Sequence, residues 1–521
     1  REAFLLGQNS MHGWWFYFPV AFLIKTPLPL LLLGGYAVIR GVIAAAHSGS
    51  RLDGLVLTLF PLLYAALSIT SDLNIGYRHL LPVLPFVTIG IASSTVKSAG
   101  WKPSIARITL YAMLLWLALG TLRIAPHQLT FFNELAGGPR NGWRYLADSN
   151  TDWGQAYKAL AEFQAKEDIE TLQVAGFVFY DPAAYGVQYT PLTPLGGNTP
   201  AVFPQRFAPP PGDYAISVTA LDGVPLADPE MYDWFRRHEP DARIANALLY
   251  YHVPYQEELQ WSAQCQVPAV PLDDDALREG LGSLPARQLE FDCTQAWIIP
   301  AAGPGIIILH GQHARNSLQT RLLLASPQLQ DDFLTRQLAG ATLSYQQQRT
   351  QATPPFNLYR TGEVALEGRL LHSSGWVAPA ETAPQSLETS QSAQGPFAFQ
   401  EGLELLGVRQ YTQPGGIEVE SWWRVVTGSQ SRPLSFMAHL VNGAGETLGI
   451  ADGLGIPAGA WQAEDVVVQR HVFALPEEAA AVGLFLRTGV YWLDDGARWK
   501  VVEEGRSADA VFIALDAIAA P

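Results

Sequence analysis

The sequence predicts a multi-domain protein: the C-terminal part of an α-helical membrane bundle (four spans plus an interfacial helix), an external α/β region, and a C-terminal antiparallel β-sandwich. Three observations lead to this prediction. Four long apolar runs lie within residues 1–126, and no later run is long enough to cross a bilayer. Helix-like and strand-like runs alternate over 127–361. Short alternating strands separated by Gly, Pro and Asp turns fill 395–521.

Charge divides the chain in the same place. Residues 1–126 carry nine Lys and Arg against three acids, a net charge of +6. The whole chain carries −15, so residues 127–521 carry −21. A body this acidic argues against a nucleic-acid partner, which rewards clustered Lys and Arg.

The four predicted membrane spans each offer close to the 20 apolar residues that a bilayer core requires. They are Pro27–Ala46, Gly54–Thr70, Leu80–Val96 and Ser104–Leu122. The aromatic-rich segment Trp14–Ile24 precedes them. Pro27 and Pro29 interrupt a continuous helix there, so we expect this segment to be interfacial or re-entrant.

Lys and Arg counts predict the orientation of the spans. The first and third loops hold two and three basic residues, whereas the loop between the second and third spans holds only Arg78. The positive-inside rule therefore places the first and third loops in the cytoplasm. Everything after about residue 126 is then extracytoplasmic, on a multi-pass cell-membrane protein whose first partner is the lipid bilayer.

Three basic side chains fall at the predicted outer membrane face: Lys25, Arg78 and His79. Charges at this depth are often functional, and three at one level favour a phosphate-binding site. Snorkelling or surface anchoring is the alternative for Lys25.

The runs FYFPVAFLIKTPLPLLLL, NIGYRHLLPVLPF and FFNELAGGPRNGWRYLADSNTDWGQ occur in that order within residues 10–256. In this region the chain resembles the C-terminal half of the protein-O-mannosyltransferase-like, phospholipid-carrier-dependent glycosyltransferases of the GT-C superfamily. The resemblance implies a polyprenyl- or dolichyl-phosphate sugar as donor, and a glycan, lipid or protein as acceptor. It also implies a catalytic acid in an external loop before this chain begins. The catalytic residues are therefore unknown, and we expect the chain alone to be inactive.

The junction Asn141–Gln155 is dense in side chains that make contacts rather than fill cores. Its candidates for contact with a sugar or acceptor are Asp148, Asn150, Asp152, Trp153 and Gln155. Aromatic faces with planar amides and carboxylates suit sugar hydroxyls. The alternative is that Asp148 or Asn150 caps the N-terminus of a helix that starts near Asp152. No metal site is predicted, because no His or Cys is near and the calcium-loop Gly and Glu are absent. The sequence requires no cofactor, and dependence on a divalent metal stays open.

Five domains are predicted: 1–126 (membrane part), 127–256 (external α/β domain), 257–361 (second external α/β region), 362–394 (linker rich in Pro, Ser, Thr and Gln) and 395–521 (jelly-roll-like β-sandwich). The only cysteines, Cys265 and Cys293, are either a disulfide or two buried thiols. In the sandwich, Trp422, Trp423 and Tyr491 either line a sugar face or fill the core.

These expectations favour a membrane glycosyltransferase that transfers a sugar from a lipid-phosphate donor at the outer membrane face. The alternative function is binding, in which the helices anchor an extracytoplasmic module that recognises carbohydrate or protein.

Overall fold

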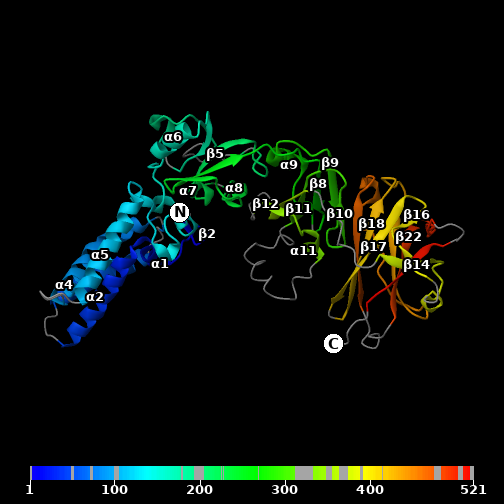
Figure 1. Ribbon diagram of the computed structural model, residues 1–521, viewed down its shortest axis with the longest axis horizontal. Helices are drawn as coiled ribbons and strands as arrows, with labels where there is room; N and C mark the ends of the chain where they lie inside the picture. The colour runs from blue at the N-terminus through cyan, green and yellow to red at the C-terminus, as the bar shows by residue number, and fades with distance from the viewer. Residues whose placement is uncertain are drawn as a thin grey trace. The chain divides into compact units, whose positions relative to one another are not determined.

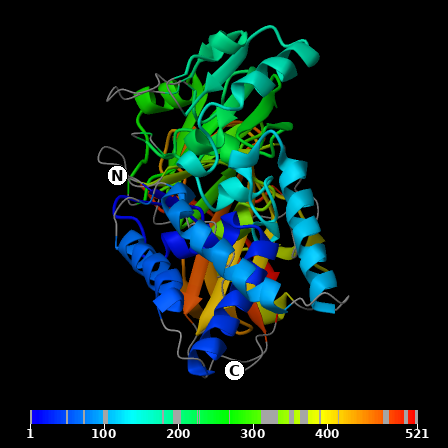
Figure 2. The same cartoon turned by 90° about the vertical axis from the view of Figure 1, so that its left-hand side faces the viewer.

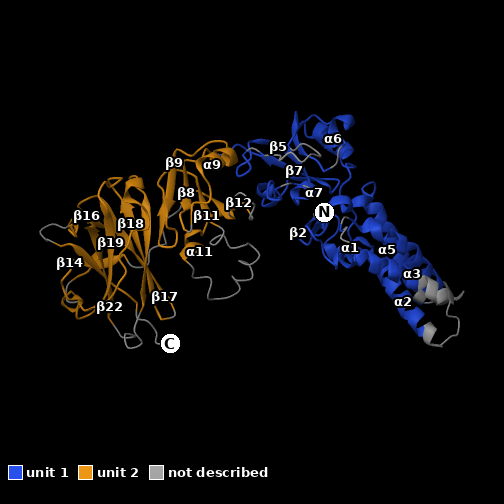
Figure 3. Cartoon of the chain, turned by 180° about the vertical axis from the view of Figure 1, so that it is seen from behind, with its two compact units in different colours: residues 1–256 blue, residues 257–521 orange. Residues whose placement is uncertain are grey.

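The structure, a computed structural model, divides into two compact units, residues 1–256 and 257–521 (Figure 3). It describes residues 3–47, 52–70, 74, 76–98, 105–177, 180–192, 203, 205–224, 226, 228–267, 269–310, 333–347, 355–362, 373–387, 391–413, 415–474, 483–502 and 508–516.

Unit 1 begins with a hairpin and a set of apolar helices. The hairpin and helices are β1 (Ala3–Leu5), β2 (Gln8–Ser10), α1 (Tyr17–Lys25), α2 (Leu28–His47), α3 (Leu52–Ile69), the 3-10 helix η1 (Tyr77–Val83), α4 (Leu84–Ser98) and α5 (Ile105–Ile124). The predicted interfacial segment Trp14–Ile24 coincides with α1. The chain bends by 114° between α1 and α2, because Thr26 is extended before Pro27.

The helices α2, α4 and α5 lie side by side, blue to cyan in Figures 1 and 2. Within the described residues, Arg107–Ile124 is long and apolar enough to cross a membrane alone, and the bent pair α1–α2 adds a second segment only if it is one broken span. The α4 helix has 15 residues, fewer than the roughly 20 that a span requires. Helices occupy the four predicted ranges, but the four-span bundle stays a prediction.

A mixed five-stranded sheet follows in unit 1, as the predicted α/β domain requires. Its strands are β3 (Leu172–Ala175), β4 (Tyr189–Pro191), β5 (Gly212–Ser217), β6 (Ala242–Ile244) and β7 (Leu248–Val253), in the order β4-β3-β5-β7-β6. The β3 strand pairs in parallel with both β4 and β5, whereas β7 pairs antiparallel with β5 and β6. The helix α6 (Tyr157–Lys166) buries Leu160 in one core, and α7 (Val218–Leu221) and α8 (Asp233–Arg236) contribute to another.

Unit 2 opens with a second mixed sheet in the order β12-β13-β11-β8-β9. These strands are β8 (Trp261–Cys265), β9 (Arg287–Phe291), β11 (Gly305–His310), β12 (Thr342–Gln347) and β13 (Phe356–Thr361). Two helices accompany them, α9 (Asp274–Leu281) and α11 (Phe333–Gln337). Asp273 caps α9 by accepting the amide of Ala276 at 2.8 Å. Cys265 and Cys293 are joined by a disulfide and are both fully buried.

The rest of unit 2 is an antiparallel β-sandwich. One sheet has the order β10-β21-β18-β17-β16 and the other β15-β14-β23-β22-β19-β20. The strands are β10 (Ala296–Ile299), β14 (Ser374–Ala378), β15 (Ala393–Gln394), β16 (Phe397–Phe399), β17 (Leu403–Gln413), β18 (Gly416–Val425), β19 (Leu434–Asn442), β20 (Thr447–Ile450), β21 (Val466–Ala474), β22 (Leu484–Trp492) and β23 (Ala510–Ala514).

The predicted domain boundaries of unit 2 need correction at two strands. The β10 strand comes from the predicted second α/β region, yet it pairs with β21 of the sandwich. The β14 strand lies inside the predicted linker 362–394, yet it pairs with β23. One hydrophobic core runs from Trp261 in the mixed sheet to Leu515 in the sandwich. Composition alone missed both strands, because each is short and its pairing depends on a strand far along the chain.

Candidate functional site

The junction loop of unit 1 is held at the carboxyl end of β5. The Ser217 hydroxyl donates to Asp152 Oδ2 at 2.6 Å, and the Asp148 amide donates to Thr219 Oγ1 at 3.0 Å. Because β3 runs parallel to β5, the carboxyl ends of both strands meet at this edge of the sheet. Ligand sites of open α/β sheets lie at such edges.

Asp152 is a buried acid within this loop. Its Oδ1 accepts the Gly154 amide at 2.8 Å, in addition to the Ser217 bond, and the residue is 1% exposed. Burial raises the pKa of the Asp152 carboxyl above its usual value, although the bonds from Ser217 and Gly154 act in the opposite direction. Its hydrogen bonds attach the loop to the end of β5, so Asp152 stabilises the position of the loop and does not face solvent.

Asn150 connects the loop to the helices. Its Oδ1 accepts the Tyr77 amide at 2.8 Å, and its Nδ2 donates to the Tyr17 hydroxyl and to the Ala147 carbonyl, both at 2.9 Å. The Asn150 carbonyl accepts the ammonium of Lys25 at 2.7 Å. One buried side chain therefore joins α1, η1 and the loop.

Lys25 lies beneath this site and does not face solvent. Its ammonium donates to the carbonyls of Leu129 and Asn150, each at 2.7 Å, and lies 4.3 Å from the centre of the Phe132 ring. The residue is 8% exposed. The prediction of three basic groups at one phosphate is therefore corrected for Lys25, because its hydrogen-bonding capacity is used by the backbone and an aromatic face.

Arg78 remains available beside Trp153, whereas the ring of its neighbour His79 lies against Phe18, with ring centroids 6.2 Å apart. Arg78 is exposed and its guanidinium carbon lies 5.4 Å from the centre of the Trp153 ring. Trp153 is 44% exposed and meets Phe177 edge-on, with ring centroids 6.3 Å apart. Within the described residues, His79 Nε2 is buried without a hydrogen-bond partner and Arg78 makes no ion pair. A cation from η1 and an aromatic face from the junction loop therefore meet at the surface of unit 1.

Gly76 allows the segment carrying Arg78 to approach the loop closely. A Cβ atom at Gly76 would lie 2.4 Å from Ser149 Oγ, which is shorter than real contacts of this kind. Any other residue at this position would therefore force the Ser149 side chain to move.

The five predicted contact residues of the loop separate into two groups. Asp148, Asn150 and Asp152 are at most 6% exposed and act within the protein, whereas Trp153 is open to solvent and Gln155 is half-buried. Gln155 Nε2 donates to the Thr151 carbonyl at 2.9 Å, and its Oε1 accepts the Trp153 amide at 2.6 Å.

The predicted helix cap at Asp148 or Asn150 is wrong. The helix α6 starts at Tyr157 after Ala156, without a side-chain cap. Asp148 instead begins the 3-10 helix η5 (Asp148–Asn150) with a φ of 58°, a conformation that Asp tolerates better than most residues.

Sequence reasoning missed Tyr17, Tyr77, Ser217 and Thr219. Tyr17 belongs to the predicted aromatic segment Trp14–Ile24, Tyr77 lies in the loop before the third predicted span, and Ser217 and Thr219 lie about 65 residues after the loop. A signal existed for Ser217, because it is the last residue of β5 and ligand sites of α/β sheets lie at the carboxyl ends of strands.

Of the two alternatives for the sandwich tryptophans, a sugar-binding face or core packing, the structure shows core packing. Trp422 and Trp423 are at most 1% exposed, and Trp423 stacks on Phe436 with ring centroids 4.6 Å apart. The Tyr491 hydroxyl donates to Asp452 at 3.1 Å. The two tryptophans belong to the core of unit 2.

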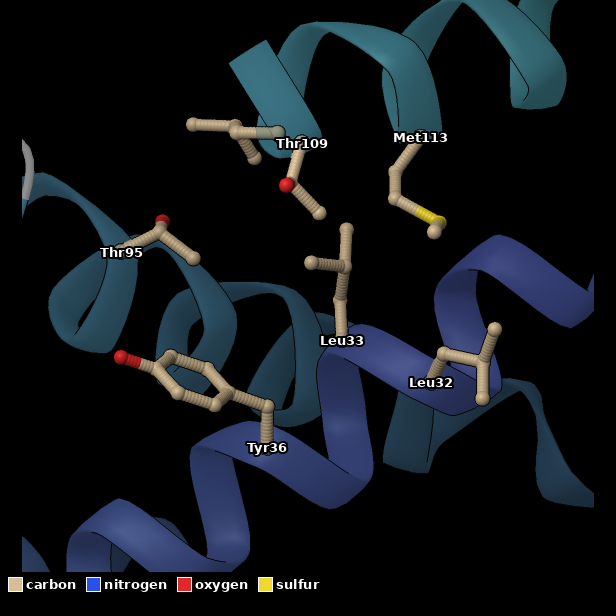
Figure 4. A pocket seen from close by; sticks show the side chains of 7 residues that line it. Leu32, Leu33, Tyr36, Thr95, Thr109 and Met113 are labelled. Carbon is tan, nitrogen blue, oxygen red and sulfur yellow. The ribbon is translucent and has the colours of Figure 1, made fainter. Parts of the chain in front are cut away.

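A separate hollow of 270 Å³ lies among α2, α4 and α5 (Figure 4). Its lining residues are Leu32, Leu33, Tyr36, Thr95, Thr109, Leu110 and Met113. None of these is charged, so the hollow offers nothing to a phosphate. In the part of the chain that the structure describes, no three His, Cys, Asp or Glu side chains gather in a way that could hold a metal ion.

Comparison with protein-family models and with curated proteins finds no match to this chain.

Proposed function

We propose that the chain forms the donor-phosphate side of a membrane glycosyltransferase, which transfers a sugar from a polyprenyl-phosphate-type carrier to an acceptor at the outer membrane face. The observation that carries the proposal is the exposed Arg78 guanidinium over the Trp153 ring. The next residue, His79, has a buried Nε2 without a hydrogen-bond partner among the described residues. The sequence resemblance supplies the reaction class.

The proposed chemistry follows from these side chains. An arginine offers a planar pair of N–H donors that fit two phosphate oxygens, and it stays charged at any physiological pH. When the bond from sugar to phosphate breaks, negative charge grows on the phosphate leaving group. Arg78 and His79 would stabilise this charge, and the Trp153 ring offers an apolar face to the sugar.

A membrane position is supported by the outward faces of the helices. Val38 is 65% exposed, Ile108 66% and Leu122 70%. Only 6% of the Arg107–Ile124 segment is buried within the protein. Exposing this much apolar surface to water is unfavourable, whereas contact with lipid tails is favourable.

An extracytoplasmic position for the polar remainder is supported by the disulfide between Cys265 and Cys293. Disulfides persist in oxidising compartments and are rare in the cytosol. Residues after about 126 would then face the compartment in which the donor presents its sugar.

The test is sugar transfer by the complete enzyme in membranes, with a labelled polyprenyl-phosphate donor. We expect Arg78→Ala to lower kcat/KM by about a hundredfold or more, the usual cost of removing one donor to a developing anion. Arg140→Ala is the matched control, because Arg140 is exposed in the same unit and stacks on no aromatic ring in its described part. Unchanged turnover in Arg78→Ala would remove Arg78 from the mechanism.

A further inference from the structure

Two buried asparagines tie the helices of unit 1 to the polar part that follows them. Asn133 donates from Nδ2 to the carbonyls of Leu23 and Thr26, at 2.6 and 2.7 Å. Asn150 donates to the Tyr17 hydroxyl, and it also accepts the Tyr77 amide. Both asparagines are 1% exposed. They differ in one respect: within the described residues, only Asn150 bonds to η1, the segment that carries Arg78 and His79.

The orientation of the Asn150 amide is fixed by its surroundings. Both hydrogens of Nδ2 have acceptors, one on Tyr17 and one on the Ala147 carbonyl, so Oδ1 must face the Tyr77 amide. That amide belongs to the first residue of η1, where the helix itself provides no acceptor. The Lys25 ammonium holds the Asn150 carbonyl from the other side.

We propose that Asn150 is a positioning residue, which sets the place of Arg78 and His79 relative to Trp153 through the Tyr77 amide. The inference rests on the proposed phosphate site. Tyr77 directly precedes Arg78, and on its other side Gly76 lies close to Ser149. A shift of the Tyr77 amide therefore moves the guanidinium, and a displacement of about 1 Å in a binding group can cost a hundredfold in rate.

The experiment uses the 521-residue chain in detergent micelles, with inorganic phosphate as the probe and ³¹P NMR as the readout of affinity. We expect Asn150→Ala to weaken phosphate binding by about tenfold, close to the loss expected for Arg78→Ala. Asn133→Ala is the matched control: it removes a comparable number of buried hydrogen bonds between the helices and the polar part of unit 1, and thermal unfolding should show a similar loss of stability. We expect it to bind phosphate like the unsubstituted chain.

A purely structural role would lower phosphate affinity equally in Asn150→Ala and Asn133→Ala, and this result would overturn the inference. Unchanged affinity in Asn150→Ala would also overturn it.

If Asn150→Ala does not fold, the variant Tyr17→Phe provides the test, because it removes only one acceptor of the Asn150 amide and keeps the aromatic ring. We expect a two- to fivefold loss of phosphate affinity in Tyr17→Phe, and no loss would refute the role of Asn150. Unchanged affinity in Arg78→Ala would instead count against the phosphate site itself.

Discussion

Arg287 and Asp465 form a bidentate ion pair in unit 2 between positions 178 residues apart in the sequence. Arg287 Nη1 donates to Asp465 Oδ1 at 2.8 Å, and Nη2 donates to Oδ2. The two side chains are 10% and 0% exposed. Arg287 comes from β9 of the mixed sheet and Asp465 precedes β21 of the sandwich, so this pair joins the two parts of the unit.

We predict that Asp465→Ala lowers the unfolding free energy of unit 2 by about 3–5 kcal/mol, because it leaves the Arg287 charge buried and unpaired. Denaturant unfolding of the whole chain measures this loss. Arg278→Ala, which breaks the exposed pair with Asp275, should change the unfolding free energy by less than about 1 kcal/mol. Equal stability of the two variants would show that the buried pair contributes nothing specific.

We predict that the buried carboxyl of Glu230 makes the stability of unit 1 depend on pH. Burial raises the pKa of its carboxyl to about 7, even though Arg236 lies 2.9 Å away, and Asp233 and Asp228 add to the rise. The unfolded chain releases this proton near pH 4.5 and the folded chain near pH 7. Between these values the unfolded state binds fewer protons, so the unfolding free energy falls as pH rises, by at most about 3 kcal/mol.

Equilibrium unfolding of unit 1 between pH 5 and 8 measures this slope. Glu230→Gln should reduce it, because glutamine does not titrate. Glu162→Gln should retain it, because Glu162 is exposed on α6. A slope that is identical in Glu230→Gln would assign the dependence to another group.

The disulfide leads to two predictions, one about the unfolding free energy of unit 2 and one about the compartment in which it lies. The Cys265–Cys293 bond closes a 28-residue separation, for which chain entropy gives a stabilisation of about 3 to 4 kcal/mol. We expect the double variant Cys265→Ala, Cys293→Ala to lose approximately this amount in denaturant unfolding. Because both cysteines are buried, the thiols are alkylated in denaturant directly after acid quenching of intact cells: we expect both to be protected, and free thiols there would contradict an oxidising location.

We predict that the hydrogen bond between Asp152 and Ser217 keeps the junction loop structurally ordered. Asp152→Ala leaves the buried Ser217 hydroxyl and the Gly154 amide without their acceptor, which costs about 1–3 kcal/mol. Asp152→Asn retains an acceptor and should cost less. Hydrogen exchange of residues 150–156 should rise in the alanine variant first, and equal exchange in both variants would argue against a loop held by this acid.

Sequence patterns predicted much of the architecture because those patterns are local. Apolar runs placed the helices within a few residues of α2, α3 and α5, and the proline pair separated α1 from α2. Alternating residues predicted the sandwich strands of 395–521. The same patterns missed β10 and β14, since each strand pairs with a strand that lies more than a hundred residues away, β21 and β23 respectively.

The candidate site was predicted less well than the fold. The loop Asn141–Gln155 was identified by its composition, and Arg78 and His79 by their position at the outer start of the third apolar run. Burial was not predictable. Lys25 and Asp152 are charged residue types that usually face water, and the structure places both inside, on acceptors and donors supplied by distant segments.

The sequence by itself determined where the chain is apolar, where it is acidic and which polar residues cluster after the last helix, because each of these properties belongs to neighbouring residues. Only the tertiary structure decided which members of the cluster face solvent. Hydrogen bonds from Tyr77 and Ser217 turn Asn150 and Asp152 inward and leave Arg78 and Trp153 outside. A side chain's exposure depends on what the rest of the chain places beside it, and that information is not local.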